Sequence, residues 1–170
     1  DTVNSIKAAN EFGITKTMKM AGLLMFMNDI HALGLANAQG LYLTDSWYWD
    51  QSPESREWSK RFFDKTKNMP SSLHAADYSA TLHYLKAVDA AKTDDGTKVI
   101  AQMKAMPTDD SLFGKSTIRA DGRKIHPALL VEVKKPAESK GPWDLYKIRT
   151  TIPADQAFRP MAEGGCPLVK

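Results

Sequence analysis

The chain has 170 residues, of which 42% are hydrophobic and 25% are charged, a composition typical of a folded globular protein with a substantial core. Its 23 basic and 20 acidic residues are interspersed and leave a formal net charge of +3, so the charge pattern gives no support for nucleic-acid binding. No apolar run approaches the roughly 18 residues that a membrane-spanning helix needs. The length allows one ordinary domain or two small ones.

The first segment has the pattern of an amphipathic helix. Apolar residues recur at helical spacing at Val3, Ile6, Ala9 and Phe12. Asp1 is a favourable N-cap and Gly13 is favourable just past a helix end, so we expect a helix between them. Such a helix in an α/β protein normally follows a strand, and the chain begins with Asp and carries no hydrophobic signal segment. We therefore expect a processed product or a fragment.

Two short buried strands are expected next. Residues 18–21 form the first, and the apolar loop Gly22–Phe26 follows it. Asn28 or Asp29 is expected to cap a short helix that Gly34 ends. Residues 41–43 form the second strand, which leads into three adjacent aromatic residues, Trp47, Tyr48 and Trp49.

These three aromatic residues have two interpretations. Ligands of open α/β sheets bind in the crevice beyond the carboxyl ends of the strands, where these rings would lie. Aromatic side chains more often bury their large areas in packing between elements. Spacing alone favours packing.

Capping signals and periodicity predict the remaining elements. Ser52 as N-cap with Pro53 behind it predicts a helix that residues 68–70 break. A longer helix is expected from Ser71 or Ser72 to residue 88 or 89, and a third, around Val99, ends at Pro107. The apolar period then changes to two, which predicts strands at 115–119, 129–133 and 145–152, a turn at 121–122, a polar hairpin connection at 136–142 and a short helix from residue 153.

No pattern indicates catalytic or metal-binding chemistry. The four histidines, His31, His74, His83 and His126, lack the spacing of a metal site, and we expect solvated or capping roles for them. The carboxylate pairs at 94–95 and 109–110 lie in turn sequences, which favours turn and capping roles. Cys166 is expected to be a free thiol or to bridge to another chain or segment. The sequence therefore predicts a protein that is not an enzyme and implies no metal and no cofactor.

Several segments, taken in order, carry a resemblance to a known family. They are Gly40–Gln51, Ser52–Trp58, Phe62–Lys65, Ala75–Ala80, Val99–Lys104, Phe113–Lys115, Arg119–Gly122 and Leu129–Lys134. In this order they resemble the carboxyl-terminal half of type I periplasmic binding proteins, and within that group the branched-chain amino acid (leucine/isoleucine/valine) receptor family of ABC transporters. The similarity covers nearly all of the chain, although no single motif is highly specific.

The resemblance implies an α/β fold, the Rossmann-like three-layer architecture of type I periplasmic binding proteins, here incomplete. Residues 1–48 would belong to lobe 2 of a two-lobed receptor, residues 49–121 to lobe 1, and residues 122–170 to lobe 2 and the tail. The family also implies a periplasmic, secreted protein that binds a small-molecule ligand between its lobes without chemistry. Its partners would be an ABC permease in the membrane and the N-terminal portion of the same receptor.

One departure from the family pattern bears on the ligand. Amino-acid-binding members place a Gly-Pro-Glu-like sequence after the first strand, whose carboxylate pairs with the ligand's ammonium group, whereas this chain has Gly22–Phe26. Asp29 is the acid that could substitute. We therefore expect an aromatic or other apolar carboxylate, with a branched-chain amino acid or amide, or a sensing or enzymatic role for the same fold, as alternatives. The ligand contacts expected by resemblance are Leu23, Leu24, Met25, Phe26, Trp47, Tyr48, Trp49 and Tyr78.

Overall fold

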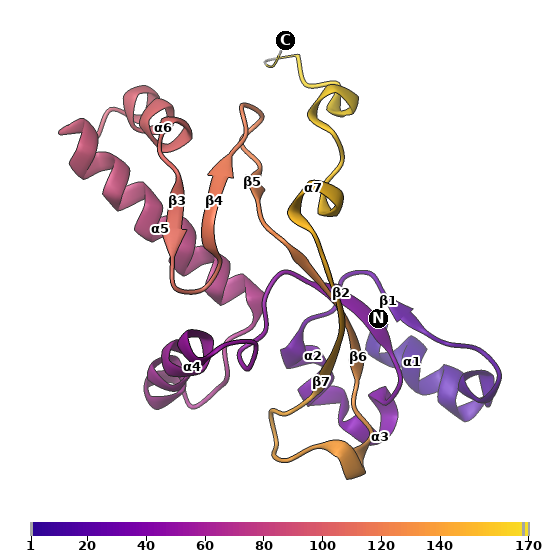
Figure 1. Ribbon diagram of the computed structural model, residues 1–170. Coiled ribbons are helices and arrows are strands. Elements are labelled where there is room, and N and C mark those ends of the chain that lie inside the picture. The colour runs from indigo at the N-terminus through magenta and orange to yellow at the C-terminus, as the bar shows by residue number, and fades with distance from the viewer. Residues whose placement is uncertain (1, 168, 170) are drawn as a thin grey trace. The chain divides into compact units, whose positions relative to one another are not determined.

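The computed structural model describes residues 2–167 and 169, which group by contacts into two compact units (Figure 1). Unit 1 comprises Asp1–Ser72 and Ala128–Thr151, and unit 2 comprises Leu73–Pro127 and Ile152–Lys170. Among the described residues, no helix combines the length and the apolar character needed to cross a membrane. The predicted lobe boundaries near residues 48 and 121 concern a complete receptor and stay a prediction.

Unit 1 is built on a four-stranded sheet with the order β1-β2-β6-β7, in which β1 and β2 are parallel and β2 and β6 antiparallel. Its elements are α1 (Thr2–Glu11), η1 (Ile14–Lys16), β1 (Ala21–Gly22), α2 (Met27–Leu33), α3 (Leu35–Ala38), β2 (Tyr42–Asp45), α4 (Pro53–Thr66), β6 (Ala128–Val133), η2 (Pro136–Glu138) and β7 (Tyr146–Ile152). A single apolar core joins α1, α2 and α3 to the strands. Strand β6 contributes the predicted alternating side chains Leu129, Val131 and Val133, all buried.

Helix α4 begins where its capping sequence predicts. The Ser52 Oγ accepts a hydrogen bond from the Ser55 N–H at 3.1 Å, and Pro53 occupies the first helical turn, where its missing N–H costs nothing. The helix ends at Thr66, and Lys67 takes a left-handed conformation with φ of 60° before the predicted break at residues 68–70. Both ends of this helix are thus encoded locally.

Unit 2 combines the longer helices α5 and α6 with a small antiparallel sheet of order β3-β4-β5 and short helical turns near the C-terminus. Its elements are α5 (Ser72–Ala91, the first residue of which belongs to unit 1), α6 (Gly96–Ala105), β3 (Thr108–Asp110), β4 (Gly114–Ile118), β5 (Lys124–Ile125), α7 (Ala154–Ala157) and η3 (Met161–Gly164). The predicted turn at residues 121–122 joins β4 to β5, and Gly122 supplies its positive φ of 86°.

Polar contacts tie the elements of unit 2 together. The buried Ser79 on α5 donates to Asp110 Oδ2 at 2.6 Å, and Lys124 Nζ donates to both of them, at 2.7 and 3.1 Å. His83 on α5 contacts the Met103 carbonyl oxygen of α6 at 2.9 Å through Nε2, which must carry the proton because a carbonyl only accepts. His83 is buried and therefore not solvated, but its contact with a carbonyl of the last turn of α6 is the capping role, the other of the two roles expected for it.

Three further expectations need correction or qualification. The first strand is Ala21–Gly22, and residues 18–20 precede it as irregular chain. Helix α2 begins at Met27, with Phe26 at the N-cap position, where we had expected Asn28 or Asp29. Of the turn and capping roles expected for the 94–95 pair, Asp95 has the capping role, because its side chain accepts from the Lys98 N–H at 2.9 Å at the start of α6. The predicted N-cap Asp1 lies outside the described residues.

Candidate ligand-binding site

The apolar loop after β1 presents two leucines to solvent. Leu23 is 96% exposed and Leu24 is 79% exposed, whereas Met25 is buried in the core of unit 1. Met25 folds back over Gly22 so closely that a Cβ added there would lie 3.0 Å from the Met25 Sδ, so a larger residue would require Met25 to shift by a few tenths of an ångström. Adjacent exposed leucines at a strand end are costly in water and are typical of binding surfaces.

The acidic residue that follows this loop is engaged in helix capping. The Asp29 Oδ2 accepts a hydrogen bond from the Phe26 N–H at 2.8 Å, as a carboxylate in the first turn of a helix commonly does. Asp29 therefore already has a structural role at the start of α2. The hypothesis that it substitutes for an ammonium-binding carboxylate gains no support from this contact.

The first residue of the aromatic segment is part of the core. Trp47 is 1% exposed, donates from Nε1 to Ser55 Oγ at 3.0 Å and packs edge-on against Trp58, with ring centroids 5.6 Å apart. Its indole thereby joins the end of β2 to helix α4. This ring has the packing role that spacing favoured.

The next two aromatic side chains converge on the backbone of Trp143. Tyr48 donates its hydroxyl to the Trp143 carbonyl oxygen at 3.1 Å, and Trp49 donates from Nε1 to the same oxygen at 2.9 Å. The Tyr48 oxygen also accepts from the Leu145 N–H at 3.1 Å. Burial of Tyr48 raises the pKa of its phenol to about 12, so it stays a neutral donor at physiological pH.

A cavity of about 380 Å³ opens beside these contacts within unit 1. We call it the aromatic pocket, because its apolar lining consists of Trp49, Phe63, Met69, Pro142 and Trp143. The charged residues Asp50, Lys134, Lys140 and Asp144 also line it. Asn28 donates from Nδ2 to the Met69 carbonyl oxygen at 3.3 Å. This hydrogen bond links the wall of the pocket to helix α2, which follows the apolar loop.

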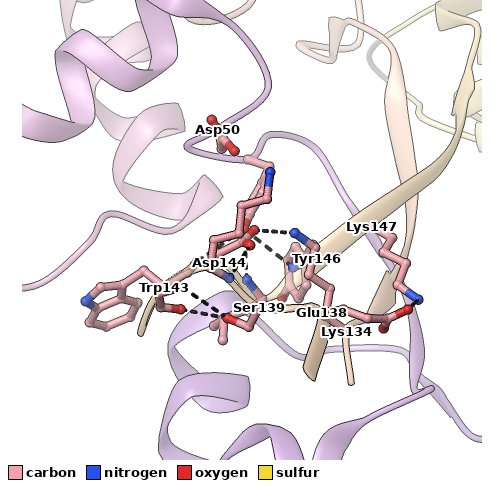
Figure 2. Close-up of polar contacts among 12 residues, drawn as sticks. Asp50, Lys134, Glu138, Ser139, Trp143, Asp144, Tyr146 and Lys147 are labelled. Atoms are coloured by element: carbon pink, nitrogen blue, oxygen red, sulfur yellow. Dashed lines mark hydrogen bonds and ion pairs between the residues drawn. The ribbon is translucent and has the colours of Figure 1, made fainter. Parts of the chain in front are cut away.

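The connection between β6 and β7 holds Trp143 in place (Figure 2). Asp144 forms an ion pair with Lys134 and accepts from the Lys140 N–H at 2.9 Å, and Ser139 Oγ donates to the Gly141 carbonyl oxygen at 2.8 Å. The Trp143 ring stacks on His31 with a centroid distance of 3.7 Å and an interplanar angle of 8°. The two preorganised indoles and the paired charge can hold a flat apolar group. Within the described residues, no group of three His, Cys, Asp or Glu side chains could hold a metal ion.

Seven of the eight predicted contacts lie in unit 1, in the loop after β1 and in the aromatic segment, whereas Tyr78 lies on α5 in unit 2. Of these eight, only Trp49 lines the aromatic pocket. Sequence reasoning missed Trp143, Phe63 and Met69 as pocket residues. Trp143 follows a segment that was expected to be a polar connection. A single tryptophan beside this polar segment was the signal that could have identified it as a pocket residue.

The chain is similar in sequence to one protein family. The family model described as "Periplasmic binding protein" matches residues 1–142. No protein with a curated description matches the chain.

Solved structures extend this similarity over the whole chain. A periplasmic binding protein from Burkholderia mallei is 60% identical, with a TM-score of 0.93 over 100% of this chain and 45% of that one. A branched chain amino acid ABC transporter periplasmic ligand-binding protein from Burkholderia xenovorans is 39% identical, with a TM-score of 0.89 over 99% of this chain and 46% of that one. An amino acid ABC transporter substrate-binding protein from Pseudomonas fluorescens is 25% identical, with a TM-score of 0.85 over 97% of this chain and 44% of that one.

These structures confirm the predicted fold class. The chain spans less than half of the length of each of these relatives, so it corresponds to part of a type I periplasmic binding protein.

Proposed function

Because the chain belongs to the periplasmic binding protein family, we propose that the protein containing it is the solute-binding subunit of an ABC importer. It works in the periplasm, captures a small molecule between two lobes, and passes it to a membrane permease. It binds its ligand without converting it. The descriptions of its structural relatives as ligand-binding or substrate-binding proteins of ABC transporters support this proposal.

The exposed leucines of the loop after β1 carry the proposal for the ligand class. Leu23 and Leu24 offer apolar surface where amino-acid-binding relatives would need a carboxylate, and Asp29 is occupied at the start of α2. An ammonium group left unpaired in a closed cleft would cost on the order of several kcal/mol. The ligand we propose is therefore an aromatic or other apolar carboxylate. Within unit 1, the contacts we propose are the predicted residues whose side chains are not buried in the core, Leu23, Leu24, Phe26 and Trp49, with Trp49 as the ring that faces the ligand.

A branched-chain amino acid is the second candidate. The relative from Burkholderia xenovorans, at 39% identity, is described as a branched chain amino acid ABC transporter periplasmic ligand-binding protein. Both candidates carry a carboxylate and an apolar body, and the difference that bears on the loop after β1 is the ammonium group. Comparing leucine with an aromatic acid that lacks an amine separates them.

The test is a thermal-shift and calorimetric screen of the complete protein against leucine, isoleucine, benzoate and phenylacetate. A micromolar ligand at millimolar concentration stabilises the folded state by about 4 kcal/mol. Stabilisation by the aromatic acids supports the proposed ligand class, whereas stabilisation by leucine alone selects the second candidate. Conversion of the bound compound, followed by mass spectrometry, would show that the protein is an enzyme.

The loop itself can be tested by a double variant, Leu23→Ala with Leu24→Ala. Because both side chains are exposed, we expect the melting temperature without ligand to stay within the effect of an ordinary surface substitution, about 0.5 kcal/mol. Loss of two apolar contacts should weaken ligand binding by about tenfold or more. Phe12→Ala is the matched control, because Phe12 is 82% exposed on another part of unit 1. Equal affinity in the loop variant and the control would exclude the loop from the site.

A further inference from the structure

Unit 2 contains a second cavity, of about 490 Å³, with a different chemistry. Four cationic side chains line it, Arg119, Arg123, Lys124 and Arg159, together with His126 and a single carboxylate, Asp121. We call it the basic pocket. None of its lining residues is among the proposed ligand contacts, so the argument below is independent of the proposed function.

The cations of the basic pocket are held in fixed positions. Arg119 donates from Nε and Nη2 to the two carboxylate oxygens of Asp121, at 3.1 and 2.6 Å, and from Nη1 to the Arg159 carbonyl oxygen at 2.9 Å. These contacts attach the β4–β5 turn to the C-terminal segment. Arg119 is thus a rigid wall of the pocket, which lowers the entropic cost of binding there.

Arg123 is the cation that remains available. Its guanidinium lies 5.3 Å from the centre of the Phe158 ring, a contact that orients the group without neutralising its charge. Among the described residues, the structure has no ion pair to Arg123, whereas Lys124 pairs with Asp110 at 3.1 Å and Arg159 with the exposed Glu163 at 3.7 Å. The pocket therefore presents an exposed guanidinium fork and a surplus of positive charge.

His126 reports the same positive field. Its Nδ1 contacts the Pro127 carbonyl oxygen at 2.7 Å and so carries the ring proton, because that oxygen can only accept. Burial of His126 lowers its pKa below the usual value, and the charges of Lys124 and Arg123 lower it further. Of these two effects only the charges of Lys124 and Arg123 also favour a bound anion, because burial disfavours any charged group.

We propose that the basic pocket binds a phosphate-type oxyanion, either free phosphate or the phosphate of an anionic lipid headgroup. Guanidinium groups match the geometry of such oxyanions because their N–H groups donate in parallel pairs. Arg123 and Arg159 make the direct contacts, and Arg119 is a positioning residue. Phosphate is preferred to a simple carboxylate because it offers more acceptor oxygens to the guanidinium donors of Arg123 and Arg159.

The first experiment titrates the complete protein with inorganic phosphate at constant ionic strength and follows the His126 ring signal by NMR, assigned with His126→Gln. An anion held beside this ring should raise the pKa of His126 by about 1. Chloride at the same ionic strength should leave that pKa unchanged. An unchanged pKa with phosphate, or an equal rise with chloride, counts against a specific site for free phosphate.

The second experiment uses a matched pair of charge removals. Arg123→Gln removes the available guanidinium and should weaken phosphate binding about tenfold, the loss expected for one charge-assisted contact. Lys115→Gln removes an equal charge from an exposed residue of β4 outside the pocket and should leave binding unchanged. Both side chains are exposed, so both variants should fold. Equal weakening in the two variants would show that only the net charge matters and would overturn the proposal.

Vesicles containing phosphatidylglycerol separate the two sources of phosphate. Vesicle binding that Arg123→Gln abolishes and Lys115→Gln preserves supports the pocket with a lipid headgroup as its ligand. Binding of free phosphate with the same variant pattern supports it with a solute. If neither vesicles nor inorganic phosphate bind in an Arg123-dependent way, the proposal is wrong.

Discussion

The aromatic pocket and the basic pocket have similar volumes, about 380 and 490 Å³, but opposite chemistry. In the aromatic pocket Lys134 and Asp144 neutralise each other, so the indoles of Trp49 and Trp143 are the main surface offered to a ligand. In the basic pocket Arg119, Lys124 and Arg159 pair with separate carboxylates, which leaves Arg123 as the cation without an ion pair among the described residues. A chain with an unremarkable net charge of +3 can thus contain one site suited to an apolar group and another suited to an anion.

The forces that hold the two pockets also differ. Around the aromatic pocket, Tyr48 and Trp49 converge on one backbone oxygen, and Trp47 is packed against α4. In unit 2, charged groups connect separate elements, as Asp110 and Lys124 connect β3 to β5. Apolar packing and ion pairs respond differently to pH and salt, which makes the comparison testable.

The largest expected effect is that of Trp47→Ala. Deleting a fully buried indole leaves a cavity and removes one hydrogen bond to the Ser55 hydroxyl, so the free energy of unfolding should fall by about 3 to 5 kcal/mol. The loss should be the same in low and high salt, because it arises from packing. Chemical denaturation monitored by circular dichroism measures it, with Phe12→Ala as an exposed control. A loss below about 1 kcal/mol would show that packing does not hold this end of unit 1.

Asp45 introduces a pH dependence into unit 1. Its burial raises its pKa from 3.8 to about 6, an effect that the Ser46 and Trp47 N–H groups oppose. A carboxyl with a raised folded-state pKa stabilises the fold below its unfolded pKa, and this contribution is lost as pH rises through 6. The shift corresponds to a loss of up to about 3 kcal/mol between pH 4 and pH 7.5.

Asp45→Asn should remove this part of the pH dependence. Denaturation of the variant at pH 4 and pH 7.5 should give more similar free energies of unfolding than denaturation of the parent protein. Asp50→Asn is a suitable control, because Asp50 is an exposed carboxylate in the same unit. An identical pH profile for Asp45→Asn and the parent would rule out a raised pKa for Asp45.

Unit 2 should show the opposite sign. Burial acts to raise the pKa of Asp110, but hydrogen bonds from Ser79, Phe113 and Leu112 and the charge of Lys124 outweigh it and lower that pKa. A lowered pKa gives stability above the unfolded pKa near 3.8, which is lost as pH falls through the folded pKa. Lys124→Met should cost about 2 kcal/mol at pH 7, less than a fully buried pair because Lys124 is partly exposed.

The cost of Lys124→Met should shrink once Asp110 is protonated. Denaturation of variant and parent at pH 7 and pH 3 measures the difference. Lys115→Met, at an exposed position of β4, controls for the change in side-chain type. A cost that is the same at both pH values would mean that Lys124 contributes by packing and not by charge.

Among the substitutions of buried and half-buried residues, Trp49→Ala should have the smallest effect on stability. This ring is half-buried, so we expect a loss of about 1 kcal/mol, whereas binding of an aromatic carboxylate should weaken about tenfold. Phosphate binding at the basic pocket should be unaffected. Calorimetric titration with both ligands tests the separation, and a parallel loss of both would show that the two pockets are not independent.

Elements with local signals could be predicted from the sequence. Ser52 and Pro53 mark the start of α4 because the hydrogen bonds of a helix cap involve residues that are close in sequence. The alternation of Leu129, Val131 and Val133 identifies β6, because one face of that strand is buried. The apolar loop at Leu23 and Leu24 was located for a similar reason, since its position follows from the strand before it.

The pockets could not be predicted, because their residues come from distant segments. Trp143 reaches Trp49 across 94 positions of the chain, and Arg119 reaches Arg159 across 40. Strand β3 was not predicted, because the sequence of Thr108–Asp110 is typical of a turn. In the structure these residues form a strand by pairing with β4. Burial of Asp45 and His83 likewise depends on tertiary packing, which the period of apolar residues does not encode.

The placement of the tryptophans has a spectroscopic consequence. All four tryptophans, Trp47, Trp49, Trp58 and Trp143, lie in unit 1. Unit 2 contains no tryptophan, and its tyrosines are Tyr78 and Tyr84. Intrinsic fluorescence excited at the red edge of absorption therefore reports the unfolding of unit 1 alone. The chain thus carries a built-in optical probe that distinguishes one half of its fold from the other.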